Sequence, residues 1–431
     1  MINSGPEPRI QLIFGSVPEC GRVYGEKTGG VFTGKISIGV VLAVCLICLS
    51  GVGVVWAIPG ELLVGSNGSG LGVGGVDRGI YEICAADRRC DPEEGILAAK
   101  SMNATLVVVT VIDNQVDKNR SVAYYPSKIV PLAGDATYDY LNRTVKAAHQ
   151  NGIKVYALIN LPHELWLAKD PGRIAVYSNG KKSDTYRRSY FYRVVPPSLV
   201  VDSPEMLGDI KSIINEVAGY GVDGIALNDN FQFPSWYLEK QKETLLSSYD
   251  AATVRRFENE TGRVVLGNGS SEWAGYIRDN PEIFYDWVSW RGKQVTRLLQ
   301  ACQQDVAESG RQIEFGPHLL VGNWVYHDNG LDYFAIAKIV DVMYLMFGDG
   351  EKNGDIPAIM RKCENATPKK IAASIYLNNT ASRNALALTE RIGIVYDNGA
   401  RQVGLFDFNQ IAWNNLSGAV GKAFASIKES T

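Results

Sequence analysis

Residues 105–113 read TLVVVTVID, residues 153–161 read IKVYALINL and residues 222–229 read VDGIALND. Each stretch is continuously apolar and rich in β-branched side chains, which is typical of parallel strands buried on both faces. Similar stretches predict five further strands, at 78–84, 312–320, 342–347, 370–378 and 402–409. Eight candidate strands therefore follow one another along the chain after residue 76.

Helical stretches separate these strands. They lie at 92–103, 136–151, 204–220, 284–309, 330–340, 355–364, 383–398 and 413–427. Several end at a glycine, as at Gly152 and Gly310, and Asp202 or Ser203 can cap the helix that begins at Pro204. This alternation predicts a (β/α)8 barrel over 76–431. A doubly wound open sheet is the alternative, but it rarely needs eight βα units, and no glycine-rich nucleotide loop follows the first strand.

An apolar run without charged residues extends over 36–58. It is long enough to cross a bilayer and too long for a cleaved signal peptide. Lys27 and Lys35 precede the run, and the first charge after it is Glu61. The positive-inside rule therefore predicts a single-pass signal anchor, with residues 1–35 as a cytoplasmic tail. A Gly/Ser-rich linker at 59–75 then leads to an extracytoplasmic barrel.

Nine Asn-X-Ser/Thr sequons follow the apolar run. They begin at Asn67, Asn103, Asn119, Asn142, Asn259, Asn268, Asn365, Asn378 and Asn415. Any one of them can arise by chance, but the set predicts an exported glycoprotein. The net charge of −3 argues against a nucleic-acid partner.

The cysteines carry little chemistry. Cys45 and Cys48 lie within the predicted membrane run, and Cys84 and Cys90 can form a disulfide in an exported domain. We expect Cys302 and Cys363 to be unpaired and buried. The chain shows no zinc-binding spacing and no cofactor motif, and a metal site built from His163, Glu164 and His318 would lack any recognised spacing.

Two predicted loops, 162–203 and 230–283, are much longer than usual βα connections. The sequence AVYSNGKKSD in the first loop predicts a hairpin that turns at Asn179-Gly180. Both loops follow the carboxyl ends of strands, where barrel enzymes place their active sites. We therefore expect the functional site at this end of the barrel.

The candidate site residues are those at the ends of the predicted strands. Asp229 is the leading catalytic candidate, with Asp407 across the barrel as a possible partner, whereas Asp223 begins its strand and is expected to be structural. The candidate substrate-binding residues are Glu82, Asp113, Asn160, His163, Glu164, Trp166, Asn228, Asn230, His318, Tyr376 and Asn378. A ring of carboxylates, amides and aromatic groups suits a polysaccharide, whose hydroxyls need paired donors and acceptors. Stacking candidates are Trp166, Tyr192, Trp236 and Trp324, whereas Trp287 and Trp290 are expected to pack.

Three segments carry a family resemblance: GVDGIALNDNFQFP at 221–234, FENETG at 257–262 and WVSWRGKQVTRLL at 287–299. Together with PHELW at 162–166, they resemble the glycosyl-hydrolase-like barrels of the bacterial peptidoglycan-glycan hydrolase lipoproteins. They are similar, more loosely, to the C-terminal barrel of poly-N-acetylglucosamine-processing export proteins. The resemblance implies an exported barrel that acts on amino-sugar polymers.

The chain departs from this family at one informative position. Where the family has adjacent acids, this chain reads Asn228-Asp229-Asn230, so one acid remains. Asp229 can still protonate a glycosidic oxygen if Asp407 or a substrate N-acetyl group supplies the second function. The alternative is a non-catalytic carbohydrate-binding or envelope-scaffold barrel. We expect Arg291 to be structural and to pair with a carboxylate.

Overall fold

The computed structural model describes residues 76–81, 91–115, 118–133, 139–186, 193–238, 240–322, 325–348, 352–366, 370–377, 385–406, 408–413 and 415–427. All of them belong to one compact unit, Val73–Thr431. The predicted tail, membrane run and linker lie outside the described residues, as do Cys84 and Cys90. Among the helices that are described, none is both long and apolar enough to cross a membrane.

Eight parallel strands form a closed barrel, as the sequence predicts. In chain order they are β1 (Asp77–Tyr81), β2 (Leu106–Gln115), β4 (Lys154–Ile159), β5 (Gly224–Leu227), β8 (Glu314–Leu320), β9 (Val342–Phe347), β10 (Lys370–Tyr376) and β11 (Gln402–Phe406). The pairing of β1 with both β2 and β11 closes the ring. A short strand, β3 (Arg120–Ala123), adds to β2 in the antiparallel direction.

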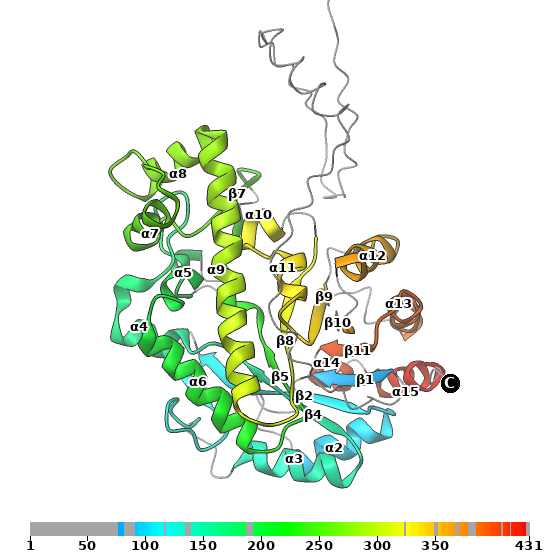
Figure 1. Ribbon diagram of the computed structural model, residues 1–431. Helices are drawn as coiled ribbons and strands as arrows, with labels where there is room; N and C mark the ends of the chain where they lie inside the picture. The colour runs from blue at the N-terminus through cyan, green and yellow to red at the C-terminus, as the bar shows by residue number, and fades with distance from the viewer. Residues whose placement is uncertain are drawn as a thin grey trace, which may run out of the picture. The chain divides into compact units, whose positions relative to one another are not determined.

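A helix follows each barrel strand and covers the outside of the barrel (Figure 1). These helices are α2 (Pro92–Ser101), α3 (Tyr140–Gln150), α6 (Pro204–Gly219), α9 (Pro281–Glu308), α11 (Tyr333–Ala337), α12 (Ile356–Ala366), α13 (Ala385–Asp397) and α15 (Ser417–Ser426). Ser203 caps α6, since its side chain accepts a hydrogen bond from Met206 N. The largest apolar cluster lies between these helices and the strands.

Two predicted elements are clearly shorter in the structure than in the prediction. The helix expected over 330–340 is present as the shorter α11, and Gly330 at φ +75° separates it from another short helix, α10 (Val325–Asn329). The strand expected over 402–409 ends at Phe406, and α14 (Phe408–Trp413) begins two residues later. The left-handed Gly330 directly follows the last residue of α10, and periodicity alone does not reveal such a helix end.

Aromatic rings fill the barrel interior because the facing positions are glycines. Tyr81 and Tyr156 belong to an inner apolar cluster that is separate from the outer core. A Cβ atom added at Gly404 would lie 1.9 Å from the Tyr81 ring, and one added at Gly224 would lie 2.6 Å from the Tyr156 ring. The Tyr81 hydroxyl also accepts a hydrogen bond from Ser374 at 2.9 Å. The interior is therefore a packed core below its mouth, not a channel.

The long connection after β5 builds a small subdomain against the first half of α9. It contains a two-stranded ribbon of β6 (Trp236–Leu238) and β7 (Glu243–Leu245), followed by α7 (Ala251–Thr261) and α8 (Ser270–Asp279). Its own apolar cluster includes Phe257, Trp287 and Trp290. Both tryptophans are buried, so the prediction that they pack is confirmed.

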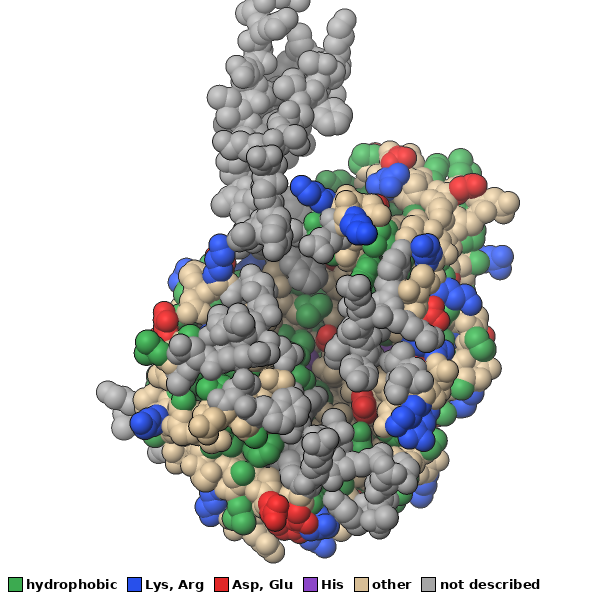
Figure 2. Space-filling model, turned by 180° about the vertical axis from the view of Figure 1, so that it is seen from behind, with side chains coloured by type: hydrophobic (Ala, Val, Ile, Leu, Met, Phe, Trp, Pro, Cys, Tyr) green, Lys and Arg blue, Asp and Glu red, His purple; other side chains and the backbone are tan. Residues whose placement is uncertain are grey.

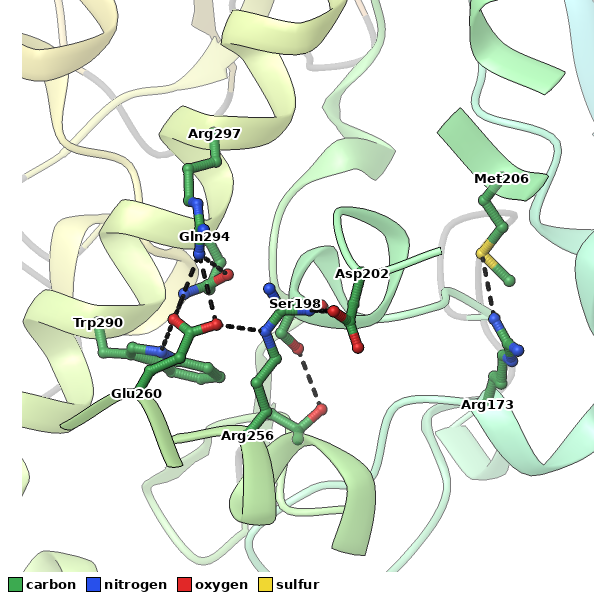
Figure 3. A network of polar contacts seen from close by, with 10 residues as sticks. Arg173, Ser198, Asp202, Met206, Arg256, Glu260, Trp290, Gln294 and Arg297 are labelled. Atoms are coloured by element: carbon green, nitrogen blue, oxygen red, sulfur yellow. Dashed lines mark hydrogen bonds and ion pairs between the residues drawn. The ribbon is translucent and has the colours of Figure 1, made fainter. Parts of the chain in front are cut away.

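A polar network ties this subdomain to α9 and to α5 (Pro197–Val200) (Figure 3). Glu260 accepts hydrogen bonds from Trp290 Nε1 at 2.9 Å and from Gln294 Nε2 at 3.0 Å. Arg256 donates to Glu260 at 2.6 Å and to the Ser198 carbonyl at 2.6 Å. The middle and the C-terminal end of α7 are thus fastened to α5 and α9.

Arg291 is structural, but its predicted carboxylate partner is wrong. The buried guanidinium donates to the main-chain carbonyls of His327 at 2.8 Å and Asp328 at 2.7 Å. It also lies 4.6 Å from the ring centroid of Phe233. Arg291 therefore joins the connections that follow β5 and β8.

Two smaller predictions are confirmed. Gly180 has φ +78° in a tight turn, and an antiparallel bridge joins Val176 and Lys182 on either side. Cys302 and Cys363 are free and buried.

Candidate active site

Three candidate residues share one level of the barrel, directly after β4 and β5 and within β8. Ile159 pairs with Leu227, and Leu227 pairs with Pro317. The next residues are Asn160, Asn228 and His318, whose side chains point toward the barrel axis by strand alternation. The register thus brings together residues separated by more than 150 positions in the sequence.

A chain of amides fixes the orientation of Asn228. Asn160 Nδ2 donates to the Ile112 carbonyl at 3.1 Å, and Asn228 Nδ2 donates to Asn160 Oδ1 at 2.9 Å. Asn228 Oδ1 is buried and has no hydrogen-bond partner among the described residues. A buried acceptor without a partner is costly, so this atom is suited to a ligand hydroxyl or N–H group.

Asp229 begins the short 3-10 helix η4 (Asp229–Phe231) directly above this level. The residue is half-buried, and its Oδ1 atom has no hydrogen-bond partner in the described part of the chain. Loss of hydration raises the pKa of the Asp229 carboxyl to about 6. A carboxyl group with such a pKa retains a proton near neutral pH and can act as a general acid.

Asn230 and His163 serve the scaffold in this structure. Asn230 Oδ1 accepts from Leu161 N at 3.1 Å, and its Nδ2 donates to Leu161 O at 3.1 Å. His163 Nε2 lies 2.7 Å from the Asn230 carbonyl, and His163 Nδ1 accepts from Val195 N at 3.1 Å. Burial lowers the pKa of His163 to about 4, so the ring is neutral. These contacts hold the connections after β4 and β5 against each other.

Two further candidates are buried side chains of α4 (His163–Lys169). The Trp166 side chain is buried, and its indole N–H donates to Asp209 Oδ2 at 3.0 Å. Glu164 is buried and forms an ion pair with Arg193 at 2.9 Å. A ligand cannot stack on an enclosed indole, so the prediction that Trp166 contacts a substrate is wrong.

His318 lies inside the barrel below the mouth. Its ring is 5.3 Å from that of Tyr81 and 5.0 Å from that of Tyr344 between centroids. The side chain is fully buried, neither ring nitrogen has a partner among the described residues, and burial lowers its pKa to about 3. His318 is thus a neutral packing residue, separated from solvent.

An aromatic pair lies at the ends of β10 and β11. Tyr376 and Phe406 are paired in register, and their rings are stacked with centroids 4.4 Å apart. Both are half-buried. Sequence analysis identified Tyr376 but missed Phe406, although Phe406 has the same strand-end position that nominated its neighbour Asp407.

The remaining candidates lie partly beyond what the structure describes. Asp113 is on β2 and is half-buried, and Trp236 begins β6. Glu82, Asp407, Asn378, Tyr192 and Trp324 lie outside the described residues. No cluster of three or more metal-ligating side chains occurs within the described ranges.

The surface is compatible with ligand entry. The face shown in Figure 2 is hollowed near its centre, and acidic and histidine side chains are visible inside the hollow.

Asp223 lies at the other end of the barrel wall, since it precedes β5 and contacts His149 at 2.9 Å and Val155 N at 2.8 Å. Its structural assignment agrees with these contacts.

Comparison with solved structures confirms the (β/α)8 barrel that the sequence predicts, and several structures that share this fold are glycoside hydrolases. The PgaB (BpsB) glycoside hydrolase domain from Bordetella bronchiseptica matches with a TM-score of 0.57 and 15% identity, over 82% of this chain and 100% of that domain. The α-L-fucosidase isoenzyme 2 from Paenibacillus thiaminolyticus matches with a TM-score of 0.55 and 12% identity. That match covers 81% of this chain and 49% of the fucosidase.

A β-galactosidase from the psychrophilic Marinomonas ef1 matches with a TM-score of 0.54 and 10% identity, over 77% of this chain and 54% of the galactosidase. This chain therefore spans about half the length of these two enzymes. No protein-family model and no curated protein matches the sequence. At these identities, the comparisons establish the fold.

Proposed function

We propose that this protein is a glycoside hydrolase that cleaves a cell-surface amino-sugar polysaccharide, with Asp229 as the general acid. The observation that carries the proposal is the Asp229 carboxyl itself. It lies at the carboxyl end of a barrel strand, with one oxygen enclosed and without a partner, and its pKa is raised to about 6. Protonation of a glycosidic oxygen near neutral pH requires a carboxyl group of this kind.

The surroundings of Asp229 support recognition of a sugar. Asn228 Oδ1 provides a positioned acceptor on one side, and the stacked pair of Tyr376 and Phe406 provides an apolar surface elsewhere on the rim. Sugar rings need both kinds of contact, because their hydroxyls form hydrogen bonds while their C–H faces pack on aromatic rings. The polymer class rests on the sequence resemblance to barrels that act on amino sugars.

We also propose that the barrel is held at the extracytoplasmic side of a membrane by the apolar run 36–58, with the N-terminus in the cytoplasm. The positions of the sequons support export. Asn103, Asn259, Asn268 and Asn415 are exposed, so an oligosaccharide on any of them would extend into solvent. Protein purified from the native host should migrate more slowly in an electrophoresis gel than its mass predicts. Treatment with a deglycosylating enzyme should restore the expected migration, and unchanged migration would count against export and glycosylation.

A second candidate is a non-catalytic carbohydrate-binding barrel. One observation favours it: the side chain that follows Asp229 is an amide, and both of its polar atoms bond to Leu161. No second carboxylate is therefore supplied from that position. Under this alternative the chain binds a glycan without breaking it.

The test measures reducing ends released by the full chain, purified in detergent, from poly-N-acetylglucosamine and from peptidoglycan strands stripped of peptides. Asp229→Asn should lower the rate by about 10²–10⁴-fold, as expected for loss of a general acid. Asp279→Asn removes an exposed carboxylate at the end of α8 and should leave the rate unchanged. Glycan binding without cleavage by the wild type would favour the second candidate.

A further inference from the structure

The end of β2 contains a β-bulge that reverses the direction of the following side chains. Thr110 pairs with Leu158, but it is Ile112 that pairs with Ile159, so one residue is added on β2. Val111 and Ile112 both lie in the outer apolar core as a result. In a regular strand Asp113 would point outward with Val109 and Val111, whereas the bulge turns it toward the barrel axis.

The segment beyond the bulge is held firmly. Asn114 Nδ2 donates to the Leu161 carbonyl at 2.7 Å, and Asn114 Oδ1 accepts from Ser121 Oγ on β3 at 2.7 Å. Asn114 and Ser121 are both buried. The backbone that carries Asp113 is therefore fixed by contacts on both sides, as a catalytic group requires.

Asp113 lies at the same level as Asn160, since Ile112 and Ile159 are partners. Only β4 separates β2 from β5, and Figure 1 shows these three strands adjacent to one another. Neighbouring strands are about 4.8 Å apart, which places the β2 and β5 backbones roughly 10 Å from each other. The inward-pointing Asp113 side chain shortens that separation. The resulting spacing suits the ~6.5–9.5 Å between the two carboxyl groups of inverting glycosidases better than the ~5–5.5 Å of retaining ones.

We propose that Asp113 is the second catalytic carboxylate, acting as the general base of an inverting glycoside hydrolase opposite Asp229. This inference rests on the proposed function and adds its second group and its stereochemistry. The site between them is marked independently by Asn228 Oδ1, which is enclosed and has no partner among the described residues.

The reaction balances with these two groups and one water molecule. Asp113 accepts a proton from the water as the water oxygen bonds to the anomeric carbon. The bond from that carbon to the glycosidic oxygen breaks, and the leaving oxygen takes the proton of Asp229. Proton exchange with solvent then restores ionised Asp113 and protonated Asp229.

The experiment compares wild type, Asp113→Asn, Asp229→Asn and the control Asp279→Asn as full chains in detergent. The substrates are poly-N-acetylglucosamine and the 2,4-dinitrophenyl glycoside of the shortest N-acetylglucosamine oligomer that the wild type cleaves. Dinitrophenolate leaves without protonation, so loss of the acid should slow polymer cleavage alone. Loss of the base should slow both substrates by about 10²–10⁴-fold. Proton NMR of the first product gives the anomeric configuration.

The expected result is inversion, together with loss of both activities in Asp113→Asn. Retention of configuration, or an Asp113→Asn rate within about threefold of an active wild type, would overturn this inference and leave the proposed function intact. Absence of cleavage by the wild type on every glycan would overturn both. The anomeric configuration is measured on the wild type, so it remains decisive if a variant does not fold.

Discussion

Replacement of Asp229 by asparagine should stabilise the protein at neutral pH. The Asp229 carboxyl has an ordinary pKa of 3.8 in the unfolded chain and about 6 in the fold, because burial disfavours its charged form. The difference corresponds to about 3 kcal/mol at ~1.4 kcal/mol for each pH unit. Above pH 6 the wild type carries this cost and the neutral amide does not.

The pH dependence follows from proton linkage. Below about pH 4 the carboxyl is protonated in both states, so the wild type and Asp229→Asn should differ little. Between pH 4 and pH 6 the folded state holds a proton that the unfolded state has released, and wild-type stability falls as pH rises. Above pH 6 the difference should level off, at no more than about 3 kcal/mol in favour of the variant.

The assay is urea denaturation of both full chains in the same detergent at pH 4, 5, 6, 7 and 8, followed by tryptophan fluorescence. Other titrating groups cancel in the difference between the two free energies of unfolding. A difference that is constant across this range, or a variant that is less stable at pH 8, would refute the assignment of a dehydrated carboxyl to Asp229.

Three further perturbations test the scaffold of the site. Gly404→Ala should destabilise the fold by about 1–3 kcal/mol or more, because the new Cβ atom would meet the Tyr81 ring at 1.9 Å. Gly208→Ala on α6 is the control: its Cβ atom would meet nothing within 4 Å, so it should stabilise the fold by up to about 1 kcal/mol. Equal thermal midpoints for the two variants would contradict the packed interior. Glu260→Ala removes the acceptor of the Trp290 and Gln294 hydrogen bonds. It should raise the rate of amide hydrogen exchange in α7, while β4 and β5 stay protected. An equal rise in α7, β4 and β5 would count against a separately fastened subdomain. Asn160→Ala leaves the Asn228 amide without its hydrogen-bond partner. Because an unsatisfied buried donor costs about 1–3 kcal/mol, kcat/KM on poly-N-acetylglucosamine should fall by roughly tenfold. An unchanged kcat/KM would show that the fixed orientation of the Asn228 amide is not needed.

Much of the barrel is predictable from the sequence because buried parallel strands must be continuously apolar. The expected strand at 342–347 agrees with β9 at both ends, and those at 105–113 and 153–161 agree with β2 and β4 within two residues. The helix expected over 330–340 is present only over Tyr333–Ala337, because the left-handed Gly330 and the capping Asp332 precede it.

The site was less predictable, because strand-end position does not specify which way a side chain faces. Asn160, Asn228 and His318 share one level, as their positions suggest, yet His318 is enclosed by tyrosines that lie far away in the sequence. His163 and Trp166 carry ring chemistry suited to sugars, but their polar atoms bond to Asn230, Val195 and Asp209. Only pairing with β4 reveals the bulge that redirects Asp113.

The most direct test of the central claim is the pH dependence of kcat/KM for wild-type cleavage of poly-N-acetylglucosamine. If Asp229 donates a proton with a pKa of about 6, kcat/KM should fall about tenfold for each pH unit above that value. Asp229→Asn should lose this limb together with most of its activity. A wild-type kcat/KM that stays constant from pH 6 to pH 8, or a limb that persists in the variant, would contradict the assignment of Asp229 as the general acid.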